Sequence, residues 1–461
     1  MDLNFNYHAS RAKKARFNEQ YGKLLKTICI VAIIICVLSG ATIVYFGSLM
    51  GLIVVSLAAW PMMFLLWQAR ELREIKPSDG SLAGLIASDL LGKLPDSPTQ
   101  KDLCKVISAT VGGKFFAARL GIPAAQLVDY VSAESNDTVA VWADALKIHA
   151  NLSDKPETLT SATILAALCR VNQTVKSMLP NLKIDEDDVV RGAEWFAHLN
   201  KLFVQSSTEK MTGGIGRDWS FGYTPMLRRF GQNFSEKFAY AKGMSVQLES
   251  HQELVDRMIE MFSKAGRQNV ALIGPVGSGK TTVVEALAER LMDGNANIPQ
   301  NLQYRQVISL DATALISAAP GRGEIEALAT QVMNEAGRAK NIILCLDNAH
   351  LFFEDATGAV DISNILQPIL ESGGMRLILA MEEQKFLEIS QRNAALAAAL
   401  NRLQVTPPNE VETMRIIEDN SLIIESEKKV IFMYQALREA YKLSERYVRD
   451  IAQPKRSIQV L

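Results

Sequence analysis

The sequence predicts three structural parts: an N-terminal transmembrane helical hairpin, an all-α double-repeat domain, and an α/β domain whose parallel sheet carries a P-loop. Three observations predict this organisation. Two apolar runs follow each other near the N-terminus, a helical pattern recurs after them, and a glycine-rich loop then precedes alternating strand and helix patterns. With 461 residues, the chain is long enough for several domains that each bury a core.

The overall charge is close to neutral. The chain has 49 basic and 50 acidic residues, which gives a net charge of −1. Nucleic-acid binding requires a basic face, so this balance argues against a nucleic-acid partner. The five cysteines are scattered without a C-x-x-C pair, and we interpret them as reduced thiols.

Residues 24–67 are predicted to form the two-helix transmembrane hairpin. The first run, 24–46, reads LLKTICIVAIIICVLSGATIVYF, and the second, 49–67, reads LMGLIVVSLAAWPMMFLLW. Each is about 20 residues long, enough to cross a hydrocarbon core of about 30 Å. A signal peptide would have a shorter apolar region and would not be followed at once by a second span. Two buried core helices are the other alternative.

Basic residues predict the topology of this hairpin. They lie before the first span and after the second, while the loop between the spans has no charge: Arg11, Lys13, Lys14, Arg16, Lys23, Arg70, Arg73 and Lys76. The positive-inside rule then places both termini and all large domains in the cytoplasm, with 1–23 as a cytoplasmic tail. We therefore expect a two-pass protein of the plasma (inner) membrane in contact with the lipid bilayer.

The predicted helical domain, residues 77–200, contains an internal similarity. Residues 101–131 lie over 163–193 without a gap, an offset of 62 residues. In this match Ile122-Pro123 falls on Ile184-Asp185, and both Pro123 and Asp185 suit the first turn or cap of a helix. Amphipathic helices resemble one another easily, so chance similarity is the alternative to duplication.

A phosphate-binding motif follows a polar connector over 201–250. The stretch NVALIGPVGSGKTTVVEALAERL, residues 269–291, reads as strand, loop and helix around G-x-x-x-x-G-K-[ST]. Lys280 would neutralise phosphate charge and Thr281 would offer its hydroxyl to Mg²⁺, so we expect ATP and Mg²⁺ as cofactors. The predicted nucleotide-binding residues are Gly274, Pro275, Val276, Gly277, Ser278, Gly279, Lys280, Thr281 and Thr282.

Three more apolar runs of strand length alternate with helical patterns: 304–311, 341–347 and 375–381. This alternation predicts a parallel sheet whose ligand lies at the carboxyl ends of the strands. Asp347 lies at such an end and is the second predicted Mg²⁺ ligand, with Thr281. Its alternative role is to cap the following helix.

Several motifs, in order and spacing, resemble the Clp family of AAA+ unfoldases, specifically its first ATPase module. They are GPVGSGKTTVVEALAERL, VISLDATALISAAPGRGEIE, NILQPILESG, LRRFGQNFSE and LSERYV. The double repeat is similar, more distantly, to the Clp N-terminal substrate- and adaptor-binding domain. The resemblance implies an AAA+ core at 251–400 with a helical lid at 401–461. It also implies a homo- or hetero-oligomeric ring, and protein substrates or adaptors bound through 77–200.

The chain departs from the Clp pattern at residues that serve ATP hydrolysis and the gripping of the protein substrate. Asn348 stands where the family has its water-activating Glu, and Met381 takes the sensor position of a threonine. Gly321 replaces the aromatic residue of the substrate-gripping pore loop. The two trans-acting arginines become Ala398 and Ala399, and Arg402 fits only with an insertion. The lid is cut short at Leu461, so we expect no second ATPase ring.

These departures leave three hypotheses. The preferred one is a membrane-anchored Clp-like protein that binds ATP and Mg²⁺, hydrolyses slowly or not at all, and acts as a scaffold, adaptor or regulatory subunit. The second is an active unfoldase that delivers substrates to a protease and uses another acid, such as Glu382 or Glu354. The third is a heteromeric ring in which another chain supplies the missing Glu and arginines.

Overall fold

The computed structural model describes residues 5–73, 82–131, 137–152, 154, 156–207, 224–236, 249–264, 266, 268–294, 296–318, 322–339, 341–353, 363–372 and 375–461. The chain divides into two compact units. The first comprises residues 1–203 with 431–436, and the second comprises 204–430 with 437–461. The predicted fold class is confirmed: an apolar helical hairpin and a helical region precede an α/β module with a parallel sheet.

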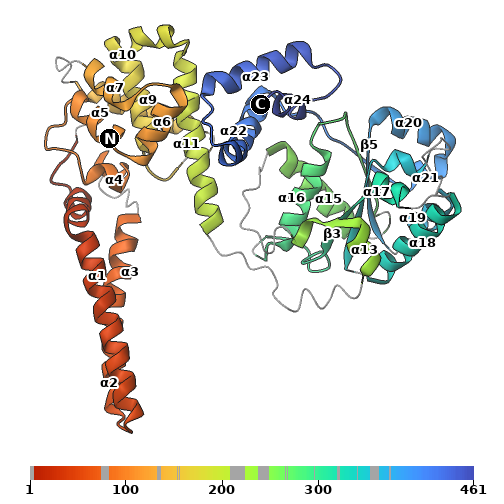
Figure 1. The fold of residues 1–461 in the computed structure, drawn as a ribbon, viewed down its shortest axis with the longest axis horizontal. Helices are drawn as coiled ribbons and strands as arrows, with labels where there is room; N and C mark the ends of the chain where they lie inside the picture. The colour runs from red at the N-terminus through yellow and green to blue at the C-terminus, as the bar shows by residue number, and fades with distance from the viewer. Residues whose placement is uncertain are drawn as a thin grey trace. The chain divides into compact units, whose positions relative to one another are not determined.

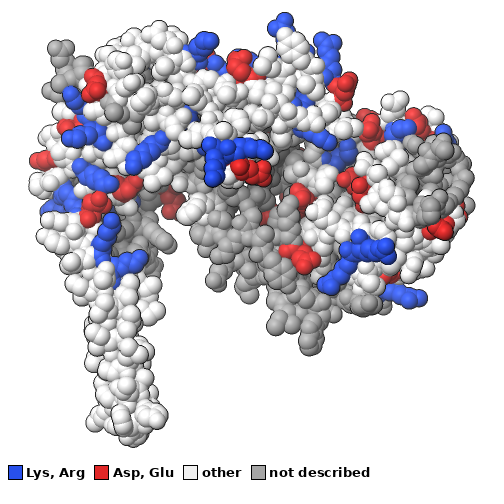
Figure 2. Space-filling model, viewed as in Figure 1, with Lys and Arg blue, Asp and Glu red and all other residues white. Residues whose placement is uncertain are grey.

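The hairpin of the first unit is made by α1 (Ser10–Tyr45), α2 (Met50–Leu57) and α3 (Ala59–Arg73) (Figure 1). Two stretches, Ser10–Tyr45 and Met50–Trp67, are long and apolar enough to cross a membrane. The second stretch breaks between α2 and α3 because Pro61 has no N–H and its ring crowds the carbonyl of Leu57. In the view of Figure 2, the outer part of the hairpin carries no charged side chain.

Near the tip of the hairpin, the two helices approach each other closely. A Cβ added to Gly51 would lie 2.5 Å from the carbonyl oxygen of Gly40, and one added to Gly40 would lie 2.4 Å from Val55 Cγ2. Only glycine permits this approach of two backbones.

The rest of the first unit is helical. Its elements are η2 (Leu82–Gly84), α4 (Ser88–Leu91), α5 (Gln100–Ser108), α6 (Val111–Leu120), α7 (Ala124–Tyr130), α8 (Val139–Asn151), α9 (Ser161–Val171), α10 (Gln173–Met178), η3 (Leu179–Leu182) and α11 (Glu186–Ser207).

Helix boundaries recur at the predicted offset. Helix α6 begins after Thr110 and α10 after Asn172, both with a side-chain N-cap. A left-handed residue follows each equivalent helix end, Gly121 after α6 and Lys183 after η3. These observations agree with the predicted duplication.

The second unit contains a six-stranded sheet in the order β1-β3-β4-β5-β2-β6. Its strands are β1 (Gly231–Asn233), β2 (Val270–Ile273), β3 (Gln306–Asp311), β4 (Ile342–Asp347), β5 (Arg376–Met381) and β6 (Asn401–Gln404). All neighbours are parallel except β1 with β3. Successive residues of β2 and β4 alternate between two buried clusters, so each face of the sheet has a core of its own.

The helices of the second unit are α13 (Pro225–Phe230), α15 (Glu249–Ser263), α16 (Lys280–Met292), α17 (Ala312–Ser317), α18 (Arg322–Ala339), η4 (Ala349–Phe352), α19 (Ser363–Ser372), α20 (Glu383–Arg392), α21 (Ala394–Ala398), α22 (Glu410–Lys428), α23 (Tyr434–Tyr447) and α24 (Lys455–Ile458). Residues 225–233, inside the expected connector, form α13 and β1 and so extend the α/β module. Strand β6, inside the expected lid, pairs with β2.

Candidate nucleotide-binding site

The P-loop residues and Asp347 meet at the carboxyl edge of the sheet. The loop follows β2 and leads into α16, while Asp347 ends β4 on the far side of β5. Because these strands are parallel, their last residues share one edge, and Thr281 Oγ1 lies 3.4 Å from Asp347 Oδ2. The structure therefore brings both predicted Mg²⁺ ligands together.

The loop conformation depends on its glycines. Gly277 and Gly279 have φ angles of +85° and +93°, which favour glycine. A Cβ on Gly277 would also lie 2.8 Å from Ile451 Cγ2 and 3.0 Å from the Ala452 carbonyl oxygen. The Ala452 amide in turn donates to the Val276 carbonyl at 2.8 Å, so the segment after α23 closes one side of the loop.

Lys280 lies within the loop that its motif predicts. Its Nζ donates to the carbonyl oxygens of Gly274 and Pro275, each at 2.9 Å. Burial lowers the pKa of Lys280, while Asp347 and Glu382 act in the opposite direction and Lys455 lowers it further. A cation held at a glycine-rich loop is suited to an anionic ligand of high charge.

Asp347 is directed to the P-loop, and the helix that follows has a different cap. The backbone N–H of Asn348 donates to Asp347 Oδ1 at 3.0 Å, which leaves Oδ2 on the Thr281 side. Asn348 is the N-cap residue of η4 and makes no side-chain cap hydrogen bond. Asn348 has φ 50° and ψ 41°, a left-handed conformation that asparagine tolerates better than most residues.

Two buried polar atoms flank the loop without a partner among the described residues, which fits a site built for a polar ligand. They are Ser278 Oγ and His251 Nδ1. His251 is 4% exposed on α15, and its Nε2 lies 3.3 Å from where a Cβ on Gly279 would be. Burial lowers the pKa of His251, while Glu412 opposes the shift. No pattern in the sequence predicts that His251 lies beside the loop, because its position depends on tertiary packing.

The residues at the expected arginine-finger positions have different environments. Ala398 is exposed at the end of α21, whereas Ala399 is 8% exposed within the sheet's apolar core. Arg402 is part of β6, and its guanidinium donates to Glu383 in an ion pair. Arg402 is thus engaged within its own chain in this structure.

The remaining predicted positions fall into two groups. Met381 is buried at the end of β5, and Glu382, the N-cap residue of α20, comes directly after it. Because Gly274 N donates to the Met381 carbonyl at 3.3 Å, the backbone of Glu382 lies close to the P-loop. Gly321 and Glu354 lie outside the described residues.

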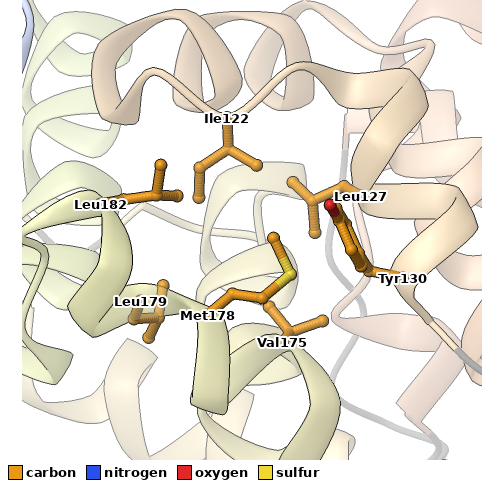
Figure 3. A pocket seen from close by; sticks show the side chains of 7 residues that line it. All are labelled: Ile122, Leu127, Tyr130, Val175, Met178, Leu179 and Leu182. Atoms are coloured by element: carbon orange, nitrogen blue, oxygen red, sulfur yellow. The ribbon is translucent and has the colours of Figure 1, made fainter.

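A second candidate site is an apolar pocket between the two repeats of the helical domain (Figure 3). The side chains of one half come from residues 122–130 and those of the other from residues 175–182. The lining residues are Ile122, Leu127, Tyr130, Val175, Met178, Leu179 and Leu182. Tyr130 and Leu182 are 42% and 36% exposed, so the rim of the pocket is open to solvent.

Comparison with known proteins agrees with the geometry. Residues 270–407 match the family described as "ATPase family associated with various cellular activities (AAA)". The ATP-dependent Clp protease ATP-binding subunit ClpC of Staphylococcus aureus (strain USA300) is 33% identical over 209 residues, 45% of this chain and 25% of that protein. The chaperone protein ClpB of Bacteroides thetaiotaomicron is 29% identical over 335 residues, 72% of this chain and 36% of that protein.

Among solved structures, the Saccharomyces cerevisiae Hsp104–ADP complex matches 50% of this chain and 40% of that chain, with 25% identity and a TM-score of 0.45. The chain thus spans 25% to 36% of the length of the two relatives described above.

Proposed function

This chain is a Clp-family AAA+ protein, and we propose that it is a membrane-anchored member that binds ATP with Mg²⁺ but turns it over slowly or not at all. In this role it acts as a scaffold, adaptor or regulatory subunit in protein remodelling or quality control. The observation that carries the proposal is Asn348, which directly follows a Mg²⁺-type aspartate beside an intact P-loop.

Nucleotide binding is supported by the residues at the sheet edge. Lys280 would neutralise charge on the β- and γ-phosphates, and Thr281 and Asp347 would hold Mg²⁺. Bound ATP would supply the phosphoryl group for any hydrolysis. Asn348 can orient a water molecule by hydrogen bonding, but its amide cannot accept the proton, so a general-base contribution of about 10²–10⁴ is missing.

The positions of the two trans-acting arginines hold alanines as well. An arginine finger contributes about 10³–10⁵ in rate in related phosphoryl-transfer sites. Ala398 offers no cation, Ala399 lies in the core, and Arg402 is paired with Glu383. Two separate contributions to one transition state are therefore lost, while the binding contribution is kept.

The hairpin and the helical domain define where the protein acts. The hairpin spans the plasma (inner) membrane and leaves both termini in the cytoplasm, as the basic residues around it indicate. The apolar pocket between the repeats binds a hydrophobic side chain of a protein substrate or adaptor. The ATPase module assembles into a ring, either of identical chains or with a related subunit.

Steady-state hydrolysis by the full-length protein in nanodiscs tests the proposal. We expect micromolar binding of a fluorescent ATP analogue together with turnover far below about 1 s⁻¹, a typical enzyme rate. Turnover at that rate or faster by the purified protein would contradict the proposal.

An active unfoldase is the second candidate function. It is favoured by Glu382, whose backbone lies beside the P-loop and whose carboxylate partly opposes the lowering of the Lys280 pKa by burial. If Glu382 is the acid that this reading requires, Glu382→Gln should reduce turnover by about 10² or more, since it removes the proton-accepting group. If another chain of a heteromeric ring supplies the missing Glu and arginines instead, turnover should appear only when that subunit is added.

A further inference from the structure

The cytoplasmic end of α1 has two faces with different environments. On one face, Ala12 and Ala15 are 0% and 3% exposed. On the other, Phe17 and Tyr21 are 51% and 44% exposed, although both side chains are large and aromatic. A helix in water that only linked a membrane span to a domain would have no reason to expose this aromatic face.

The buried face packs against the helical domain. A Cβ on Gly92, just after α4, would lie 3.2 Å from the Ala15 carbonyl oxygen and 3.1 Å from Glu19 Cβ. Glu19 also forms an ion pair of 3.5 Å with Lys93. The small residues and the close approach show that α1 is part of the domain's structure, well before the apolar run begins at Leu24.

Further toward the N-terminus, the Arg11 guanidinium donates to the carbonyl of Gly84, at the end of η2. Burial lowers the pKa of Arg11. This contact fixes the first turns of α1 to a second element of the domain.

The exposed face continues the surface of the membrane span. Lys13, Phe17 and Tyr21 follow one another at intervals of four residues, and Leu24 and Ile28, 61% and 56% exposed, continue the same stripe into the apolar run. The Phe17 and Tyr21 ring centroids are 5.4 Å apart. Aromatic residues beside lysine are typical of the headgroup layer of a membrane.

The length of the stripe fits a whole bilayer. From Phe17 to Phe46 the helix rises by about 44 Å, and a bilayer with its headgroup layers is about 40–45 Å thick. At the other end, Tyr45 and Phe46 are 87% and 85% exposed, which places aromatic residues at both ends of the stripe.

From these observations we infer that residues 17–23 of α1 lie in the headgroup layer, where Phe17 and Tyr21 contact anionic phospholipids, and that Lys13, one helical turn before Phe17, faces the lipid phosphates from the outer edge of this layer. The opposite face of the same helix holds the helical domain, which is therefore seated on the membrane surface. Lys23, exposed at the start of the apolar run, adds a second cation for lipid phosphate. This inference rests on the proposed membrane anchoring.

Photo-crosslinking of the full-length protein tests the lipid contact. Benzoylphenylalanine replaces Phe17 in nanodiscs that contain equal amounts of phosphatidylglycerol and phosphatidylcholine, and mass spectrometry identifies the adducts. We expect lipid adducts at Phe17 with phosphatidylglycerol enriched severalfold. The same substitution at Phe203, a 73% exposed aromatic residue of α11, is the comparison position for a protein surface away from the stripe.

Three outcomes separate the inference from the proposed anchoring. Lipid adducts at Phe64, in the second span, without any at Phe17 would overturn the inference and keep the anchoring. No lipid adduct at Phe64 would overturn the anchoring itself. Adducts at Phe17 with protein only would assign the stripe to a protein contact and so overturn the inference.

Charge variants test the preference for anionic lipid. Each lysine near a membrane surface contributes about fivefold to association with acidic lipid, so Lys13→Ala and Lys23→Ala should each reduce phosphatidylglycerol enrichment by about that factor. Lys101→Ala, at an exposed lysine of α5, should leave it unchanged. Equal labelling of the two lipids by the parent protein would overturn the preference.

A zero-length carboxylate–amine crosslink tests the docked face. We expect Glu19 and Lys93 to crosslink in the parent protein and to lose at least tenfold in yield in Gly92→Leu, whose side chain cannot fit beside Ala15. The Asp154–Lys201 pair of the helical domain, at 2.6 Å, reports whether the variant is still folded. An undiminished Glu19–Lys93 crosslink in a folded Gly92→Leu variant would show that α1 is not docked in this way.

Discussion

Two halves of one sheet edge differ in what they keep. At the end of β2, the P-loop has its glycines, Lys280 and Thr281, and Asp347 lies within reach of Thr281. At the ends of β4 and β5, Asn348 and Met381 occupy the positions where the Clp family has a water-activating Glu and a sensor threonine. A site that loses function through random change would be expected to degrade in both halves. Here the residues proposed to bind nucleotide are all present, which supports the proposal that this module binds ATP.

The largest expected effect is a loss of ATP affinity when the P-loop lysine is removed. Lys280→Ala should weaken ATP binding by on the order of a hundredfold, because it removes a charged donor from a partly buried phosphate site. Titration of a fluorescent ATP analogue measures the loss. Lys264→Ala, at an exposed ion pair with Glu260, should bind as the parent protein does. Retained affinity in Lys280→Ala would move the nucleotide site away from the loop.

A second prediction rebuilds the hydrolysis half. Asn348→Glu combined with Ala398→Arg should raise turnover by on the order of a hundredfold, well beyond the product of the single changes, when the module forms a ring. The excess arises because a base and an arginine act together on one transition state. Ala398→Lys in the same background is the control, since lysine lacks the planar fork of arginine. Multiplicative single effects would show that the two positions do not act together.

Adjacent alanines give the third prediction, which concerns stability. Ala399→Arg should destabilise the module by roughly 3 kcal/mol, because its position in the core would bury an unpaired guanidinium. Ala398→Arg should change stability little, since Ala398 is exposed. Thermal unfolding of the two variants measures the difference. Equal melting temperatures would mean that the core opens at Ala399, and both arginines of the family could then be restored.

Much of the α/β fold could be predicted because its signals are local. Apolar runs bounded by polar residues gave β3, β4 and β5 within two residues of their ends, and the glycine pattern gave the loop. Strand β1 was not predicted within the expected connector because three residues are too few to show a strand pattern, although they lie in the family-like motif LRRFGQNFSE. It is a strand only because it pairs with β3.

The candidate site was predictable where a motif fixes the spacing of residues, and not where packing decides. The Thr281–Asp347 approach follows from two motifs and a parallel sheet. In contrast, nothing local distinguishes Ala398 from Ala399, or predicts that His251 packs against Gly279. The left-handed backbone of Asn348 was also invisible in the sequence, although asparagine is a residue that adopts it.

That backbone makes Asn348→Glu alone the smallest expected effect. A glutamate at φ 50° and ψ 41° should cost about 1 kcal/mol of stability, because left-handed geometry crowds its Cβ against the following carbonyl. Its carboxylate could accept a proton, but without an arginine from a neighbouring subunit the transition state stays poorly stabilised, and turnover should rise less than about tenfold.

Asn348→Gly is the matched control: it accepts the same backbone without a carboxylate, so its stability should equal or exceed the parent's while turnover is unchanged. Hydrolysis and thermal unfolding measured together on both variants separate backbone strain from missing chemistry. A rise of a hundredfold or more in Asn348→Glu alone would show that the amide was the sole defect, and that the hydrolysis half of the edge is otherwise intact.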